Sequence, residues 1–206
     1  MVRYKKSEEK QKLVLYAAFQ AVSELGFDSV TLQVIADYAK VSKGVVHYYF
    51  ESKEAVLIEL LKWLTAKIYE KECAAIKLEK SAANKLHAYI GSAFVSPEKN
   101  RTFYRVYLDF LAKASRNPVY REINQQFYDN CNAIGQEIIQ LGQKEGIFAV
   151  NLSAEQTAPK IRAVIDGHLI QWLMIDRDDL HEFYREACLQ TVMSMLNNFG
   201  GFEAKK

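Results

Sequence analysis

Two short amphipathic segments between residues 31 and 50 constrain the fold of this chain more than any other feature. The first opens at Thr31, and the second runs only from about Ser42 to Phe50, after the turn Lys40-Val41. Helices this short are marginal in water on their own, and each of these offers only two or three apolar side chains to a core. They must therefore pack together and on a neighbouring helix, which is the arrangement of a helix-turn-helix.

The neighbouring helix is expected directly upstream. It should begin near Ser7, where a capping residue is followed by two acids that suit the positive end of the helix dipole, and it should end at Gly26. Its buried stripe should consist of Val14, Ala18, Val22 and Leu25. A further helix should start at Ser52 and continue without a Gly, Pro or Ser-rich linker. We therefore expect one domain at residues 1–51 and a second, mechanically coupled domain at residues 52–206.

The rest of the chain is also predicted to be helical. Only 3 prolines and 9 glycines interrupt the 206 residues, half of which are hydrophobic. Helix starts are indicated by Ser81, by Ser96-Pro97-Glu98, by Asn117-Pro118, and by capping boxes at Ser153 with Gln156 and at Asp179 with Glu182. The matching stops are Gly146 and Gly200-Gly201. The predicted fold class is all-α, with an N-terminal three-helix helix-turn-helix domain and a C-terminal helical domain.

Composition excludes several classes of protein. No uninterrupted apolar stretch approaches the roughly 18 residues of a membrane helix, so we expect no membrane partner. Three widely separated cysteines suggest neither a disulfide framework nor a zinc motif, and we expect a cytoplasmic protein. The net charge is +2, and residues 1–53 carry 8 Lys or Arg against 6 acids. The whole excess therefore lies where a helix-turn-helix would meet phosphates.

The segment from Gly26 to Lys53 combines several specific features: Gly26-Phe27, Thr31, Ile35-Ala36, Val41-Ser42-Lys43-Gly44, Tyr48-Tyr49-Phe50 and Ser52-Lys53. Together these residues resemble the DNA-binding signature of tetracycline-repressor (TetR) family regulators. The resemblance covers roughly residues 10–60. Farther along, residues 165–176 resemble the eighth-helix segment of one broad subgroup of that family.

This resemblance implies a function and the residues that perform it. It implies a ligand-responsive repressor that binds a palindromic double-stranded DNA operator as a homodimer and is released by a small molecule. The implied phosphate contacts come from Thr31, Ser42, Tyr48, Tyr49 and Lys53, and the implied base-edge contacts from Lys43, Gly44, Val45 and His47. Two of these depart from the family pattern, in which the position of Val45 often carries a small hydroxyl or amide residue and that of His47 a Tyr. Val45 can offer only apolar contact, for instance to a thymine methyl.

A small apolar or cationic effector is expected to bind in the C-terminal domain. Its candidate contacts are aromatic and apolar residues at helical spacing, although such stripes are more often core: Trp63, Phe94, Phe103, Tyr107, Phe110, Phe127, Cys131, His168 and Trp172. His168 interrupts an apolar helix, and a hydrogen-bonded core or interface histidine is the favoured alternative there. Arg105, Asp109 and Lys113 are spaced i, i+4, and we interpret them as a solvated ion-pair face.

The last two helices are expected to form the dimer interface, because they carry more apolar surface than one subunit can cover. The candidate interface residues are Ile161, Val164, Ile165, Gly167, Phe183, Ala187, Val192 and Leu196. Gly167 would let helices of two subunits approach closely.

Two other functions stay open. A helical-bundle enzyme such as a di-iron oxygenase is disfavoured, because none of the four histidines follows a Glu by three residues and no phosphate loop or dinucleotide fingerprint occurs. We therefore expect no catalytic activity, no metal and no cofactor. An architectural DNA-binding protein without ligand sensing would have a solid C-terminal core in place of a cavity, and both kinds of core need the same apolar residues.

Overall fold

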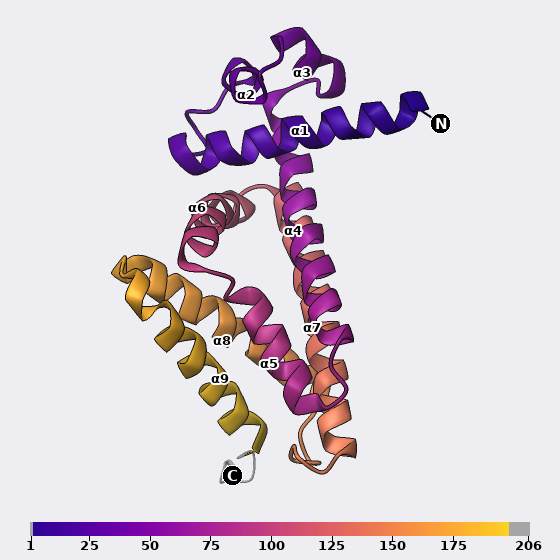
Figure 1. Cartoon of the computed structure of the whole chain (residues 1–206), viewed down its shortest axis with the longest axis vertical. Coiled ribbons are helices and arrows are strands. Elements are labelled where there is room, and N and C mark those ends of the chain that lie inside the picture. The colour runs from indigo at the N-terminus through magenta and orange to yellow at the C-terminus, as the bar shows by residue number, and fades with distance from the viewer. Residues whose placement is uncertain (1, 198–206) are drawn as a thin grey trace. The chain divides into compact units, whose positions relative to one another are not determined.

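Residues 2–197 are described by the computed structural model, and all regular structure in that range is helical (Figure 1), which confirms the all-α prediction. The helices are α1 (Val2–Leu25), α2 (Leu32–Ala39), α3 (Lys43–Tyr49), α4 (Lys53–Lys77), α5 (Ala82–Ala93), α6 (Pro97–Ala114), α7 (Pro118–Lys144), α8 (Ala154–Ile175), a 3-10 turn (Asp178–Leu180) and α9 (His181–Asn197). Over these residues, no helix combines the length and the apolar character that a membrane crossing requires.

The chain folds into two compact units and passes between them more than once. The first unit combines Met1–Ala66 with Thr102–Asn124, and the second combines Lys67–Arg101 with Gln125–Lys206. Helices α4 and α7 therefore begin in the first unit and end in the second, while α6 runs from the second into the first. The domain boundary expected after residue 51 would divide α1, α2 and α3 from the rest of the chain. The first compact unit is larger, because it also includes about half of α4 and segments of α6 and α7.

Helices α1, α2 and α3 form a small bundle through contacts of α2 with each of the other two. Val14, Ala18 and Val22 of α1 are buried as predicted, but Leu25 is 45% exposed. Leu25 is the last residue of the helix, and Gly26 turns the chain directly after it with a φ of +78°. The predicted start of α1 near Ser7 is also wrong, because no Pro or Gly in the preceding residues stops the helix from extending back to residue 2.

Local capping signals predicted most of the other helix starts. The hydroxyl oxygens of Thr31, Ser81 and Ser153 each accept a hydrogen bond from the backbone amide three residues later, at 3.2, 3.3 and 3.2 Å. The prediction that Asp179 caps a helix, in contrast, is wrong. This residue lies inside the 3-10 turn, where its carboxylate accepts a hydrogen bond from Nε of Arg177 at 3.1 Å.

Helix α7 ends in a tight reversal that depends on two glycines. Gly146, a predicted stop, adopts a left-handed φ of +74° just after the helix. The buried Phe148 ring folds back onto Gly142 so closely that a Cβ added to Gly142 would lie 2.0 Å from the ring. The other predicted stop, Gly200-Gly201, lies outside the described residues.

In the second unit, α8 and α9 run side by side and α5 packs against α9 (Figure 1). The corner between α8 and α9 is held by the buried Trp172, whose Nε1 donates to the carbonyl of Arg177 at 2.9 Å. The His181 ring lies edge-on to Trp172 at a centroid distance of 4.8 Å, and its Nε2 is 2.9 Å from Oδ1 of Asn100. Because burial lowers the pKa of His181, this histidine is a neutral part of the core.

Gly142→Ala is expected to destabilise the protein by about 1–3 kcal/mol, because the new methyl group would overpack against the Phe148 ring. That loss should outweigh the gain of up to about 1 kcal/mol that alanine has over glycine inside a helix. Gly91→Ala in α5 is the matched control, since a Cβ there meets nothing within 4 Å and only the gain applies. Denaturant unfolding measures both changes. A Gly142→Ala protein as stable as the wild type would show that the ring moves aside at no cost.

Candidate functional site

One face of α3 is exposed and carries the side chains that can reach a partner. Its exposed residues, with the preceding cap, are Ser42, Lys43, Gly44, His47 and Tyr48. Lys43 and His47 stand one above the other at positions i and i+4, and Tyr48 is 81% exposed. The opposite face anchors the helix, because Val46 and Phe50 are only 0% and 4% exposed. Most of the predicted DNA contacts in this segment are therefore accessible together.

Two further predicted contacts of α3 are only partly accessible. Val45 and Tyr49 are half-buried, and the Tyr49 ring lies edge-on to that of Tyr48 at a centroid distance of 5.0 Å. Gly44, in contrast, is open, since a Cβ added there would meet only Oγ of Ser42 at 3.8 Å. The packing of this chain does not require a glycine at that position. A glycine there leaves room for a close approach from outside the molecule.

The remaining predicted phosphate contacts, Thr31 and Lys53, flank α3. Thr31 is exposed, and capping α2 uses an acceptor lone pair of its hydroxyl rather than the O–H donor. Lys53 is engaged within the chain. Its Nζ donates to the carbonyl oxygen of Asp28 at 3.2 Å and lies 5.5 Å from the centroid of the Phe27 ring. Lys53 therefore supports the loop between α1 and α2.

Two side chains of α6 hold the same loop. Oδ2 of Asp109 accepts the backbone N–H of Phe27 at 3.1 Å, and Nζ of Lys113 pairs with the Asp28 carboxylate at 2.8 Å. The hydrogen bond and the charge of Lys113 lower the pKa of Asp28. Asp109 therefore does not belong to the solvated ion-pair face expected of Arg105, Asp109 and Lys113, whereas Lys113 does form a solvent-exposed ion pair, but with Asp28 of the loop. Their spacing does place them on one helix face, but that face is turned to the loop.

The predicted effector contacts divide between the two compact units. The first unit holds Trp63, Phe103, Tyr107 and Phe110, and the second holds Phe94, Phe127, Cys131, His168 and Trp172. Trp63 is half-buried, and its Nε1 is a buried donor without a hydrogen-bond partner. His168 fits the alternative expectation, because its Nδ1 is 2.8 Å from the carbonyl oxygen of Val164.

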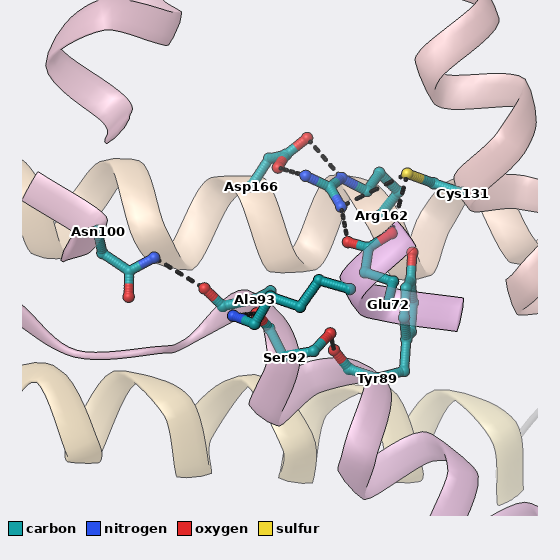
Figure 2. A network of polar contacts seen from close by, with 9 residues as sticks. Glu72, Tyr89, Ser92, Ala93, Asn100, Cys131, Arg162 and Asp166 are labelled. Carbon is teal, nitrogen blue, oxygen red and sulfur yellow. Dashed lines mark hydrogen bonds and ion pairs between the residues drawn. The ribbon is translucent and has the colours of Figure 1, made fainter. Parts of the chain in front are cut away.

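A buried polar cluster in the second unit was missed by sequence reasoning. Arg162 of α8 binds both oxygens of Asp166, at 2.9 and 3.2 Å, and Oε1 of Glu72 on α4 at 2.9 Å (Figure 2). Cys131 of α7 donates its S–H to Oε2 of Glu72 at 3.5 Å. The side chains of Arg162, Glu72 and Asp166 are only 5%, 1% and 15% exposed. Apart from the i, i+4 pair within α8, no local pattern links these residues, which is why the sequence did not reveal them.

Burial governs the ionisation of this cluster. It raises the pKa of Glu72, although Arg162 and Cys131 act in the opposite direction. It also raises the pKa of Cys131 to about 12, so the thiol stays protonated. Burial disfavours the charge of Arg162, but Asp166 and other neighbours raise its pKa, so the guanidinium stays charged. Within the described residues, no group of three or more His, Cys, Asp or Glu side chains is arranged to hold a metal ion.

Comparison with known families accounts for most of the chain. Residues 14–60 match the bacterial regulatory proteins of the tetR family, and residues 82–197 match the C-terminal domain of BetI-type transcriptional repressors. The chain belongs to the TetR family. The resemblance noted in its helix-turn-helix sequence is thereby confirmed.

Curated TetR-type relatives match at low identity. The transcriptional regulator YuxN of Bacillus subtilis (strain 168) is 28% identical over 182 residues, which are 88% of this chain and 50% of the relative. BetI of Rhizobium meliloti (strain 1021) is 28% identical over 114 residues, which are 55% of this chain and 56% of the relative. The chain therefore spans about half the length of these curated relatives.

Solved TetR-like structures share the fold over nearly the whole chain. A transcriptional regulator from Saccharomonospora viridis, in complex with choline, superposes with a TM-score of 0.81 at 24% identity, covering 90% of this chain and 96% of the other. FadR of Bacillus subtilis, in complex with stearoyl-CoA, gives a TM-score of 0.77 at 23% identity, covering 89% and 97%. At these identities the likeness establishes the fold.

The expected dimer residues of this TetR-family chain are of two kinds. The first kind is at most 1% exposed within a single chain and comprises Ile161, Ile165, Val192 and Leu196. These four pack inside the subunit, so a second copy cannot reach them, and assigning them to an interface is not supported. The second kind comprises Phe183, which is 63% exposed, and the half-buried Val164, Gly167 and Ala187. Helical spacing identified apolar positions correctly but not which of them face outward.

Lys53→Ala is expected to lower the free energy of unfolding by about 0.5–2 kcal/mol, because the Asp28 carbonyl loses a donor and the Phe27 ring loses a cation. Lys43→Ala, which removes an exposed lysine of α3, is the matched control and should leave stability unchanged. Urea unfolding followed by circular dichroism compares them. Equal stability of the two variants would show that the contacts of Lys53 contribute nothing to the loop.

Proposed function

We propose that this chain is a ligand-responsive transcriptional repressor that binds a palindromic operator as a homodimer and is released from it by a small molecule. The observation that carries the proposal is the exposed face of α3, where Lys43, Gly44 and His47 stand outward and Val46 anchors the helix. A short helix held in this way is the reader of a helix-turn-helix protein. The protein would act in the cytoplasm, where its operator lies.

The exposed residues divide into base readers and phosphate contacts. Lys43 and His47 share one face and can both address base edges in the major groove, where a lysine donates well to guanine O6 or N7. Ser42, Tyr48 and Thr31 surround them and suit phosphate oxygens, which fix the register of the helix on the duplex. Lys53 donates one of its three ammonium N–H groups to the Asp28 carbonyl, which leaves two donors for a phosphate.

A second copy would pair through the outward surfaces of α8 and α9. Met174 and Phe183 are large apolar side chains that are 67% and 63% exposed, so a second copy could cover them. Gly167 lies on α8 with open space above it, so another helix can approach its backbone. A two-fold pair would present two α3 helices to half-sites roughly 34 Å apart.

The effector is proposed to be a small apolar or cationic molecule held in the C-terminal domain. The buried aromatic residues of the second compact unit, Phe94, Phe127 and Trp172, support an apolar body. The surplus of carboxylates over guanidinium in the cluster of Glu72, Asp166 and Arg162 supports a cation. Two neighbours in fold, crystallised with choline and with stearoyl-CoA, motivate one probe of each kind.

Two other functions have less support. The family consists of transcriptional regulators, and we propose that the chain has no catalytic activity, since the titratable side chains of its core bind one another. In an architectural DNA-binding protein without an effector, the buried polar atoms that lack hydrogen-bond partners would have no role beyond packing. That alternative predicts DNA binding that no small molecule changes.

His47→Ala and Lys43→Ala are expected to flatten the discrimination between operator and random DNA by about 1–3 kcal/mol per lost contact. Lys53→Ala should instead lower the slope of log K against log salt by about 1.8 per dimer, if its ammonium moves to a phosphate. An operator selected from a random library is titrated against a scrambled duplex at several salt concentrations. Lys62→Ala is the control, since Lys62 is paired with Glu59 on α4. If all three variants bind the operator like the wild type, α3 does not read DNA.

Gly167→Arg is expected to convert a dimer into a folded monomer, because a Cβ there meets nothing within 4 Å in the subunit while the long side chain would occupy the approach of a second helix. Gly91→Arg on α5 is the matched control, since it too meets open space, and it should stay dimeric. Sedimentation velocity at micromolar concentration gives the mass, and circular dichroism confirms the fold. A monomeric wild type would refute the homodimer.

A further inference from the structure

The turn between α2 and α3 holds Lys40 in a left-handed backbone conformation. Lys40 caps α2 with a φ of 53° and a ψ of 43°. Its N–H donates to the carbonyl of Asp37 at 3.1 Å, and the N–H of Val41 donates to the carbonyl of Ala36 at 3.0 Å. These hydrogen bonds close the C-terminus of α2 and reverse the chain toward α3. The turn therefore fixes the backbone of residue 40 but makes no use of its side chain.

Lysine is an unfavourable residue for this conformation. A left-handed backbone brings the Cβ close to the following carbonyl oxygen, so glycine is preferred at such helix ends. Over the described residues a positive φ occurs at two glycines, Gly26 and Gly146, and at one other non-glycine residue, Asp176. Aspartate tolerates the conformation better than lysine, and the carboxylate of Asp176 is bound by Arg101. Lys40 has neither advantage.

The side chain of Lys40 does not repay this cost within the chain. Lys40 is exposed, and among the residues that the structure describes its ammonium has no hydrogen-bond or ion-pair partner. The nearest acid in sequence, Asp37, accepts a hydrogen bond from Nε2 of Gln33 at 2.8 Å instead. Backbone strain that no internal contact explains is typical of functional positions. The reason for a lysine at this turn is therefore to be sought outside the chain.

The position of Lys40 along the chain suits a contact with the DNA backbone. Lys40 precedes Ser42, the cap of α3, by two residues, and two residues of chain span at most about 7 Å. The flexible four-carbon stem of lysine extends its ammonium beyond that. Residues 31–53 contain three lysines, Lys40, Lys43 and Lys53, and two acids, Asp37 and Glu51. Lys40 therefore supplies the surplus positive charge of the segment that would face the duplex.

We propose that Lys40 binds a phosphate of the DNA backbone, and that lysine is kept at this strained position because the turn presents its ammonium beside the exposed face of α3. An ammonium is a compact charge that attracts phosphate without reading the bases. Each subunit contributes one such contact, so a dimer makes two. This assignment rests on the proposed function, and it adds to the DNA interface a residue that lies outside both α2 and α3.

Lys40→Gly should stabilise the fold and weaken DNA binding at the same time. Its Tm should rise by about 2–4 °C, because glycine adopts the left-handed conformation without strain. The slope of log K against log salt should fall by about 1.8 per dimer, since each lost phosphate contact removes about 0.9. Affinity for operator and scrambled duplex should fall by the same factor, about tenfold or more at 0.15 M salt. Damage to the helix-turn-helix cannot produce this pair of results, because it would lower the Tm.

Two further substitutions at the same position separate charge from backbone strain. Lys40→Gln removes the charge and keeps a side chain in the left-handed conformation, so it should melt like the wild type and bind DNA with the reduced salt slope of Lys40→Gly. Lys40→Arg keeps both the charge and the strain and should match the wild type in both measurements. Fluorescence anisotropy of a labelled duplex at several salt concentrations gives the slopes. Thermal unfolding followed by circular dichroism gives the Tm values.

Two variants elsewhere in the chain are the matched controls. Lys62→Gln removes another exposed lysine, one that pairs with Glu59 on α4, and it should leave the salt slope unchanged. Asp176→Gly places a glycine at the other non-glycine residue with a positive φ, in the second compact unit. Its salt slope should also equal that of the wild type, because a change of backbone strain alone removes no phosphate contact.

The proposal is overturned if Lys40→Gln and Lys40→Gly keep the salt slope of the wild type, or if Lys40→Gly melts below the wild type. The first result denies the phosphate contact, and the second denies the strain. A loss of affinity for the operator but not for the scrambled duplex would also overturn it, because a phosphate contact does not distinguish sequences. Each result leaves the repressor function standing as long as Lys43→Ala and His47→Ala flatten the discrimination. A wild type that binds no duplex refutes the repressor function as well.

Discussion

The burial of Phe27 is the interaction on which the position of the helix-turn-helix depends. Its ring lies edge-on to Phe110 and Tyr120, at centroid distances of 5.5 and 6.2 Å, and the ammonium of Lys113 covers it at 4.9 Å. Its backbone N–H is held by Asp109. Helices α2 and α3 are too short to stay folded alone, so their position is set by this loop and by packing on α1. Whatever moves α6 must therefore act on the loop through these contacts.

The sequence predicted best those features that a few neighbouring residues decide. A cap at Ser81 or Ser153 needs only a hydroxyl and an amide three residues later, and both were found where expected. The inward side of α3 follows from helical spacing in the same way. The resemblance to TetR regulators depends on this well-defined segment as well, which explains why the family could be recognised before any fold was known.

Features that join distant parts of the chain could not be predicted. Asp109 and Phe27 are 82 residues apart in sequence, and Glu72 and Arg162 are 90 apart. The spacing of Asp109 and Lys113 is the same whether their face meets water or a loop, so it could not decide between the two. Periodicity likewise marked Ile165 and Phe183 as apolar, although one is fully buried and the other is 63% exposed.

Helix α4 has a mechanical consequence of its own. It runs for 25 residues, from Lys53 to Lys77, and contains neither Gly nor Pro, so it behaves as a stiff rod about 37 Å long. Pivoting such a rod by about 5° shifts its far end by about 3 Å, close to the roughly 3.4 Å rise of one base pair. In the proposed repressor, a displacement too small to disturb the hydrophobic core at one end of α4 would thus shift the exposed face of α3 by about one base-pair step at the other end.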